Sequence, residues 1–174
     1  MKVSTSVISD PNTLLNRARE MLDQGQVEAA LDVLDSCGQS SRTIQNAKGV
    51  CMMRLGRHEL AMKIFRDLVF PGGSFAIPDE TPTIFRSNYA TSLLLVDNVV
   101  TGLQILGQIP DRQHPAVVHL KAAVRKWKAS MSWLTRIGLL IGITPQKPFN
   151  MDSSPGALLI PSSGERPKPV ERAA

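Results

Sequence analysis

The sequence predicts an all-α protein built from successive antiparallel helix pairs. The main observation is a repeated motif. Gly25–Leu31 and Gly56–Met62 share the pattern Gly-x-x-Glu-x-Ala-apolar, and their first residues are 31 positions apart. Each copy follows a segment whose apolar residues recur every three or four positions, as on one face of a helix. Small residues also match at this offset, as Ala18 does with Gly49. A fixed period of this kind is typical of stacked helix pairs.

Length and composition indicate one domain with its own apolar core. The chain has 174 residues, of which 43% are hydrophobic. No apolar run approaches the roughly 18 residues that a membrane-spanning helix needs, and the N-terminus lacks the apolar core of a secretory signal. We therefore expect a cytoplasmic protein. Cys37 and Cys51 each fall within a predicted helix, where a buried free thiol is the expected state.

The first two helix pairs are predicted at residues 10–38 and 41–69, after a flexible arm at residues 1–9. Asp10 followed by proline is a favourable helix start. Gly25 and Gly56 suit the left-handed turn that ends the first helix of each pair. The second pair ends at the run of proline and glycine that begins at Pro71.

A third pair is predicted at residues 82–109, after an irregular loop at residues 70–82. The loop contains several prolines and glycines, which exclude one regular element. In the third pair Asp97-Asn98 replaces the turn glycine, since Asn tolerates the left-handed region. Gly102 stands at the position that Ala30 and Ala61 occupy in the first two pairs.

One continuous capping helix is predicted at residues 115–141, followed by a Pro-rich tail at residues 145–174. Apolar residues from Val117 to Ile141 keep an alternating spacing of three and four, and a terminal helix is what a stacked array requires at its exposed end. The tail contains six prolines, so most of it is expected to be disordered. Its apolar part, residues 148–160, is a candidate to lie along the domain or along a partner as an extended strand.

Basic residues are concentrated near the C-terminal end. The stretch from Arg112 to Met151 contains seven Lys and Arg residues and no acidic residue. Lys121, Arg125 and Lys128 share one flank of the predicted capping helix. A basic amphipathic helix is suited to an anionic lipid surface, nucleic acid or an acidic partner. The alternative is that this flank is only the solvated outer face of the capping helix.

The three pairs share small and large residues at matching positions. These are the small residues Ala18, Gly49 and Ala90, then the large Met21, Met52 and Leu93, the turn residues Gly25, Gly56 and Asp97, the small Ala30, Ala61 and Gly102, and the closing Leu34, Phe65 and Leu106. This pattern resembles the tetratricopeptide repeat over roughly residues 11–110. The spacing of 31 residues is shorter than the usual period of about 34. The resemblance implies a right-handed superhelical stack of three pairs and a protein-binding scaffold.

The resemblance also implies a concave groove lined by the first helix of each pair. By matching positions, its candidate partner-binding residues are Asn12, Arg19, Asn46, Val50, Arg54, Ser87 and Thr91. The alternative is that these residues form solvated helix faces. One subgroup of the family clamps a C-terminal carboxylate with cations. The matching places here hold Leu15, Arg19, Ala47, Ile84 and Asn88, of which only Arg19 is cationic, so that mode is disfavoured.

These observations predict a non-enzymatic adaptor that binds a peptide or helix of another protein. We expect no catalytic residues, cofactor, metal site or small-molecule substrate, because His58, His114 and His119 lack metal-ligand spacing with the cysteines or carboxylates. No G-x-S-x-G motif is present either. Two alternatives remain open: a peripheral membrane or nucleic-acid-associated protein that uses the basic helix at residues 115–141, and a secretion-type chaperone.

Overall fold

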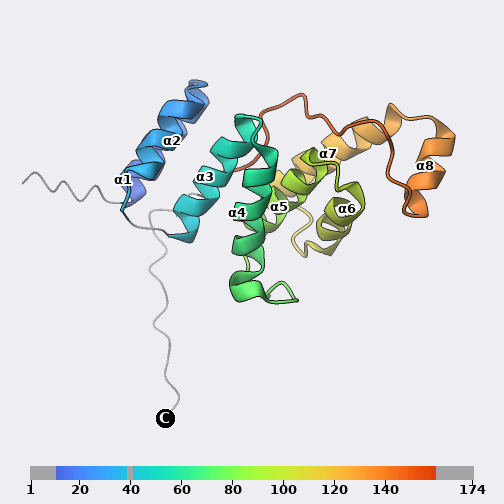
Figure 1. The fold of residues 1–174 in the computed structure, drawn as a ribbon, viewed down its shortest axis with the longest axis horizontal. Helices are drawn as coiled ribbons and strands as arrows, with labels where there is room; N and C mark the ends of the chain where they lie inside the picture. Colours follow the sequence, from blue (N-terminus) through green and yellow to red (C-terminus); the bar gives the residue numbers. More distant parts are fainter. Residues whose placement is uncertain (1–10, 39–40, 160–174) are drawn as a thin grey trace, which may run out of the picture.

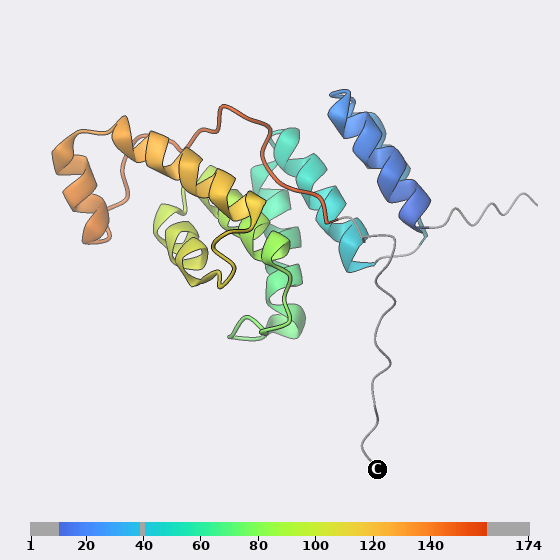
Figure 2. The same cartoon turned by 180° about the vertical axis from the view of Figure 1, so that it is seen from behind.

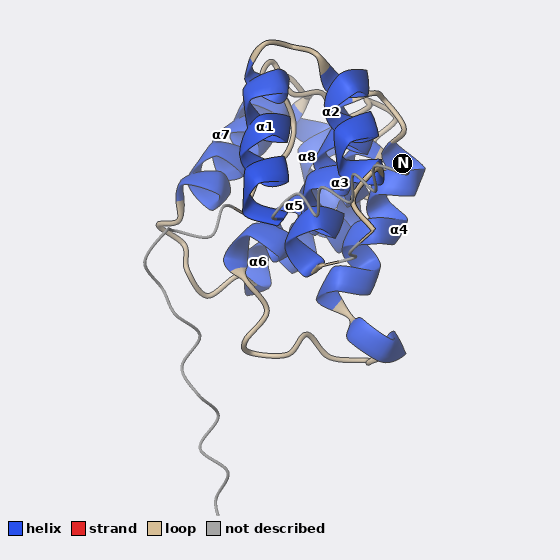
Figure 3. Ribbon diagram, turned by 90° about the vertical axis from the view of Figure 1, so that its left-hand side faces the viewer, coloured by secondary structure: helices blue, strands red, loops and turns tan. Residues whose placement is uncertain are grey.

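The protein is all-α over the residues that a computed structural model describes, which are residues 11–38 and 41–159 (Figure 1). The end-on view shows helices and loops only in this part of the chain (Figure 3). Within it, no helix combines the length and apolar character needed to cross a membrane. The elements are α1 (Pro11–Asp23), α2 (Val27–Asp35), α3 (Arg42–Arg54), α4 (His58–Val69), a short 3₁₀ turn (Pro71–Gly73), α5 (Thr83–Leu95), α6 (Val99–Gln108), α7 (Pro115–Ala129) and α8 (Trp133–Leu140).

Helices α1 to α6 pack in chain order, each against the next. Helix α5 also packs against α7. This central position explains why every residue from Phe85 to Leu94 is buried, polar side chains included. Helices α1 and α2 lie at one end of the molecule and α8 lies at the other (Figure 1).

The three turns that join α1 to α2, α3 to α4 and α5 to α6 have the same geometry. Their central residues Gly25, Gly56 and Asp97 have positive φ angles of 77°, 73° and 59°. The sequence pointed to Asn98 as the residue tolerant of this conformation, but Asn98 has φ −83° and Asp97 takes the left-handed position. In each turn the following amide donates to a carbonyl five residues earlier: Gln26 to Met21 at 2.8 Å, Arg57 to Met52 at 2.9 Å and Asn98 to Leu93 at 2.9 Å. This bond satisfies a carbonyl at the helix end and folds the chain back.

Small residues lie where paired helices cross. A Cβ atom added to Gly49 would lie 2.5 Å from Cζ of Phe65, and one added to Gly102 would lie 2.9 Å from Cγ of Leu94. The alanines at matching positions are fully buried, namely Ala18, Ala30, Ala61 and Ala90. The small residues therefore permit helix separations that larger side chains would prevent.

The predicted single helix at residues 115–141 is wrong, because the chain forms α7 and α8 with a break at residues 130–132. Ser130 closes α7, and its hydroxyl donates to the carbonyl of Trp127 at 2.6 Å. Ser132 opens α8, where its side-chain oxygen accepts from the amide of Thr135 at 3.3 Å. Serine side chains compete with the helical backbone for hydrogen bonds. The three- and four-residue spacing of apolar residues continues across the break, so it does not reveal the break.

The Pro-rich tail is not disordered in the part that is described. After α8 the chain turns back, and residues 147–159 run across α7 towards α3 as an extended segment (Figure 2). Buried Phe149 and several hydrogen bonds hold it, and these contacts offset the ordering entropy that a proline-rich sequence must lose. Residues 160–174 and the predicted arm at residues 1–9 lie outside the described residues.

The insertion at residues 70–82 is held by one buried side chain of α5. The guanidinium of Arg86 donates to the carbonyls of Pro78 at 2.8 Å, Asp79 at 3.1 Å and Thr81 at 3.1 Å. An irregular loop leaves backbone carbonyls without regular partners, and Arg86 supplies donors for three of them.

Candidate functional site

The candidate site is the inner surface of α3, α5 and α7, which residues 147–159 cover. We call these residues the C-terminal segment. The segment passes first along α7 and then over α5 to α3 (Figure 2). Its contacts fall into three groups: a backbone contact at α3 and α5, an aromatic contact at α7, and polar pairs with α7 between them.

The backbone contact consists of two buried asparagines. Asn88 of α5 donates from Nδ2 to the carbonyl of Ala157 at 2.7 Å and accepts from the amide of Ala157 at 2.9 Å. Asn46 of α3 donates from Nδ2 to the same carbonyl at 3.3 Å, and its Oδ1 accepts from Asn88 at 2.8 Å. Both side chains are at most 1% exposed. An amide side chain offers one acceptor and two donors, so the pair satisfies both backbone groups of Ala157 through hydrogen bonds that do not involve its side chain.

Arg54, at the end of α3, extends this contact by one further carbonyl. Its Nε donates to the carbonyl of Pro155 at 3.4 Å, and its Nη1 donates to the carbonyl of Leu22 at 3.3 Å. The guanidinium is a fork of fixed geometry. It therefore joins the C-terminal segment to the end of α1.

Gly156 fits a position that other residues cannot occupy without displacement. Its φ angle is +85°, which side chains disfavour. A Cβ atom there would lie 2.5 Å from Cε of Met53 and 3.1 Å from Cγ2 of Val50. The surface of α3 thus demands a glycine one residue before the backbone contact.

The aromatic contact holds the other end of the segment against α7. Phe149 is 3% exposed and meets Trp127 edge-to-face, with ring centroids 5.6 Å apart. The indole Nε1 of Trp127 donates to the carbonyl of Pro148 at 3.0 Å. Edge-to-face aromatic pairs contribute roughly 0.5–1.5 kcal/mol beyond the area they bury. This contact fixes the segment where it leaves α8.

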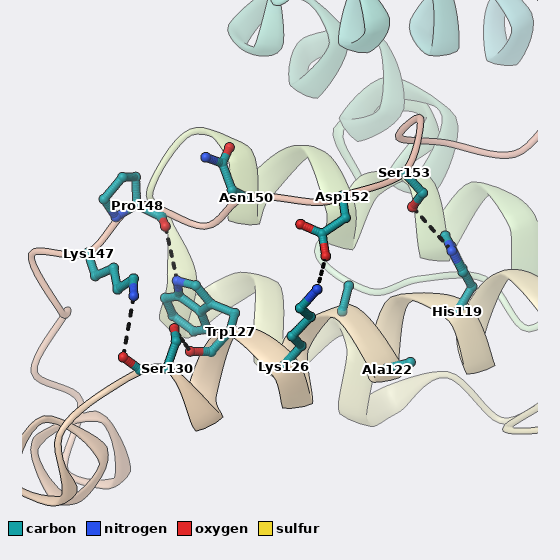
Figure 4. A pocket seen from close by; sticks show the side chains of 11 residues that line it. His119, Ala122, Lys126, Trp127, Ser130, Lys147, Pro148, Asn150, Asp152 and Ser153 are labelled. Carbon is teal, nitrogen blue, oxygen red and sulfur yellow. Dashed lines mark hydrogen bonds and ion pairs between the residues drawn. The ribbon is translucent and has the colours of Figure 1, made fainter.

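Polar side chains bridge the segment and α7 between these two contacts (Figure 4). Lys126 pairs with Asp152, and the hydroxyl of Ser153 lies 3.2 Å from Nε2 of His119. Both pairs border a cavity of about 500 Å³ that also reaches Trp127. Since the side chains of Lys126 and Asp152 are about three-quarters exposed, solvent screening leaves this ion pair a small share of the binding free energy.

The structure brings five of the seven predicted groove residues to the C-terminal segment. Asn46, Val50 and Arg54 face it as described above. Ser87 and Thr91 line a small cavity of about 40 Å³ beneath Gly156 and Ala157, and the hydroxyl of Thr91 donates to the carbonyl of Ser87 at 2.9 Å.

The other two predicted groove residues, Asn12 and Arg19, are exposed on α1. Arg19 pairs with Asp23 on the same helix, with 3.8 Å between Nε and Oδ2. No hydrogen bond found in the described residues joins Asn12 or Arg19 to the C-terminal segment.

Asn88 makes two hydrogen bonds to the backbone of the segment. The sequence named Asn88 only among the positions of the disfavoured carboxylate-binding mode, and it was not among the predicted groove residues. In the matched register Asn88 takes the position of Ala47, which packs inside the core. The available signal was polar composition. Residues 86–88, 91 and 92 of α5 are polar, although the segments before and after this helix in the sequence are rich in apolar residues. Buried polar groups require partners, so this run indicated that α5 binds something polar.

The predicted basic face lies away from the C-terminal segment. Lys121, Arg125 and Lys128 line a groove of about 530 Å³ between α6 and α7. The apolar residues Leu103, Leu106 and Val124 lie in the same groove. The basic residues therefore border a second surface, separate from the asparagine contact.

In the described part of the chain we looked for side chains that could bind a metal ion or act as a nucleophile. Residues 11–38 and 41–159 contain no cluster of three His, Cys, Asp or Glu side chains arranged to hold a metal ion. Burial raises the pKa of the Cys51 thiol to about 11, which keeps it protonated at neutral pH. Comparison of the chain with protein-family models, curated proteins and solved structures finds no match.

Proposed function

We propose that this protein is a non-enzymatic scaffold that holds an extended segment of polypeptide along the inner face of α3, α5 and α7. The observation that carries the proposal is the pairing of both backbone groups of Ala157 by buried Asn46 and Asn88. This contact recognises the peptide backbone, as strand addition does at a sheet edge, while the adjoining surfaces determine which side chains fit. The same surface can therefore hold a segment from a partner protein.

The arrangement of the helices supports a tetratricopeptide-like stack. Three turns share one left-handed geometry, and small residues recur at the crossings of α1 to α6. Stacked hairpins of this kind present the first helix of each pair on one face. We infer that α1, α3 and α5 form a right-handed superhelical face, to which α7 adds a fourth helix.

A partner segment must compete with the protein's own C-terminal segment. A tethered ligand has an effective concentration on the order of millimolar for a short flexible connection, so an external ligand binds more weakly than the bare surface would allow. Release of the C-terminal segment and occupation by a partner are then linked steps. A secretion-type chaperone that wraps a client segment would use the same surface.

The experiment compares partner capture by tagged full-length variants in cells of the source organism. Asn46→Ala with Asn88→Ala removes the backbone contact and is expected to lose at least tenfold of specific partner recovery. Gly156→Val should displace the segment from its backbone contact at α3 and α5 without substituting any helix residue, and it is expected to raise recovery of the same partners. Lys63→Ala, an exposed change on α4, is the matched control and should equal the wild type.

The two opposite directions make this test specific. A change in protein level or folding would move both variants the same way. Equal partner recovery by the wild type and the double asparagine variant would contradict partner binding on the inner face of α3, α5 and α7. If partner recovery falls in both the double asparagine variant and Gly156→Val, the C-terminal segment stabilises the fold and does not compete with partners.

A further inference from the structure

Helix α8 presents its apolar side to solvent. Trp133, Leu134, Ile137 and Ile141 are 67%, 63%, 48% and 73% exposed. Leu139, which projects from the opposite side of the helix, is buried. The side chains that α8 would ordinarily bury against a neighbour are therefore turned outward. We call Trp133, Leu134, Ile137 and Ile141 the α8 apolar face.

The turn before α8 differs from the turns inside the three helix pairs. The turns that fold α2, α4 and α6 back each contain a residue with positive φ. Ser130 and Ser132 have φ −80° and −64°, and no residue of this turn is left-handed. Helix α8 is not among the helices that pack closely against α7, and it lies at the end of the molecule farthest from α1 (Figure 1).

Two cations are held together at the base of α8. Arg136 donates from Nη2 to the carbonyl of Ala129 at 2.8 Å, and Lys147 donates from Nζ to the carbonyl of Ser130 at 3.3 Å. These carbonyls belong to adjacent residues at the end of α7, so both cations are held where α8 begins, and both side chains are exposed. The stretch from Arg112 to Met151 contains no acidic residue. Asp152, the next residue, borders the same cavity as Lys147 and pairs with Lys126.

We propose that α8 binds the surface of an anionic phospholipid membrane. The α8 apolar face enters the boundary between headgroups and acyl chains, while Arg136 and Lys147 meet the lipid phosphates. A helix with an apolar face and basic flanking residues lies in this interface, and tryptophan favours the same depth. A second copy of the chain fits less well, because each copy would bring the same two cations to the contact.

This inference goes beyond the proposed scaffold function and rests on different residues. The basic flank predicted from the sequence, Lys121, Arg125 and Lys128, lies beside the groove between α6 and α7. The apolar side chains suited to a membrane lie on α8 instead. Anchoring through α8 would leave the inner face of α3 and α5 free to hold a partner.

The experiment is flotation of the full-length protein with vesicles, combined with tryptophan fluorescence. Vesicles of phosphatidylcholine with about 30% phosphatidylserine are expected to bind the protein, and pure phosphatidylcholine vesicles are expected to bind at least tenfold less. High salt should weaken binding, since screening shortens the range of the Arg136 and Lys147 charges. The emission of Trp133 should shift to shorter wavelength. Trp133→Phe should abolish the shift and keep binding, because Trp127 is already buried.

Matched substitutions distinguish membrane binding by α8 from non-specific adsorption of exposed apolar residues. Ile137→Asp with Ile141→Asp is expected to lower vesicle binding at least tenfold, and Arg136→Glu should lower it several-fold. Phe75→Asp is the matched control, because Phe75 is a fully exposed apolar residue in the loop before α5. Absence of wild-type binding, or equal binding by the α8 variants, would overturn the proposal. Light scattering that shows a wild-type dimer and monomeric α8 variants would also overturn it in favour of a second copy.

Discussion

Cys51 illustrates how burial of one titratable side chain couples to stability. Desolvation is the main cause that raises the pKa of its thiol from 9.0 to about 11, and it outweighs the nearby positive charge of Arg54. The folded state thus holds the proton more tightly than the unfolded state. Its contribution to folding is complete below about pH 9 and is lost as the pH rises towards 11.

We therefore expect the stability difference between the wild type and Cys51→Ala to depend on pH. The difference in unfolding free energy should be constant up to about pH 8.5 and should change by on the order of 1–2 kcal/mol, against the wild type, by about pH 10.5. Tyr89, whose pKa is also raised by burial, is present in both proteins and cancels. Urea unfolding at several pH values measures this difference. A difference that stays constant over the range would contradict burial of the thiol.

At the scale of elements, the crossing of α3 and α4 depends on Gly49. We expect Gly49→Ala to destabilise the fold by about 1–3 kcal/mol, because a Cβ atom would press on the buried ring of Phe65. The gain in helix propensity, about 1 kcal/mol, is too small to offset the displacement. Thermal or urea unfolding measures the result.

Gly107 provides the matched control for this substitution. It also lies within a helix, α6, but nothing lies within 4 Å of a Cβ atom placed there. Gly107→Ala should stabilise by about 0.5–1 kcal/mol. If both substitutions stabilise the protein, the close crossing of α3 and α4 does not exist.

The elements that the sequence could predict are those fixed by local chemistry. The left-handed turns at Gly25 and Gly56, and the small residues at Gly49 and Ala61, are set by contacts within one or two neighbouring helices. The break between α7 and α8 was hidden, because apolar spacing continues through it. Serines at 130 and 132 were the available sign, and serine also occurs within helices, as Ser92 does in α5.

At the scale of the whole molecule, the C-terminal segment crosses helices that are distant in sequence. Asn88 and Ala157 are 69 residues apart, and Asn46 and Ala157 are 111 apart. Such pairings leave no local pattern, so the sequence could indicate residues 148–160 only as a candidate strand. The groove residues on α3 and α5 followed from a repeat register. Asn88 and the requirement for Gly156 needed the three-dimensional contacts.

The most direct measurement of the central claim is binding of a labelled peptide with the sequence of residues 147–159, followed by fluorescence anisotropy. The receptor is the full-length Gly156→Val variant, whose own segment should no longer occupy the backbone contact at α3 and α5. We expect the peptide to bind this receptor, to bind at least tenfold more weakly when Asn88→Ala is added, and to fail when its own glycine is replaced by valine. Equal binding with and without Asn88, or no binding to the Gly156→Val receptor, would contradict the claim that this surface holds an extended segment through its backbone.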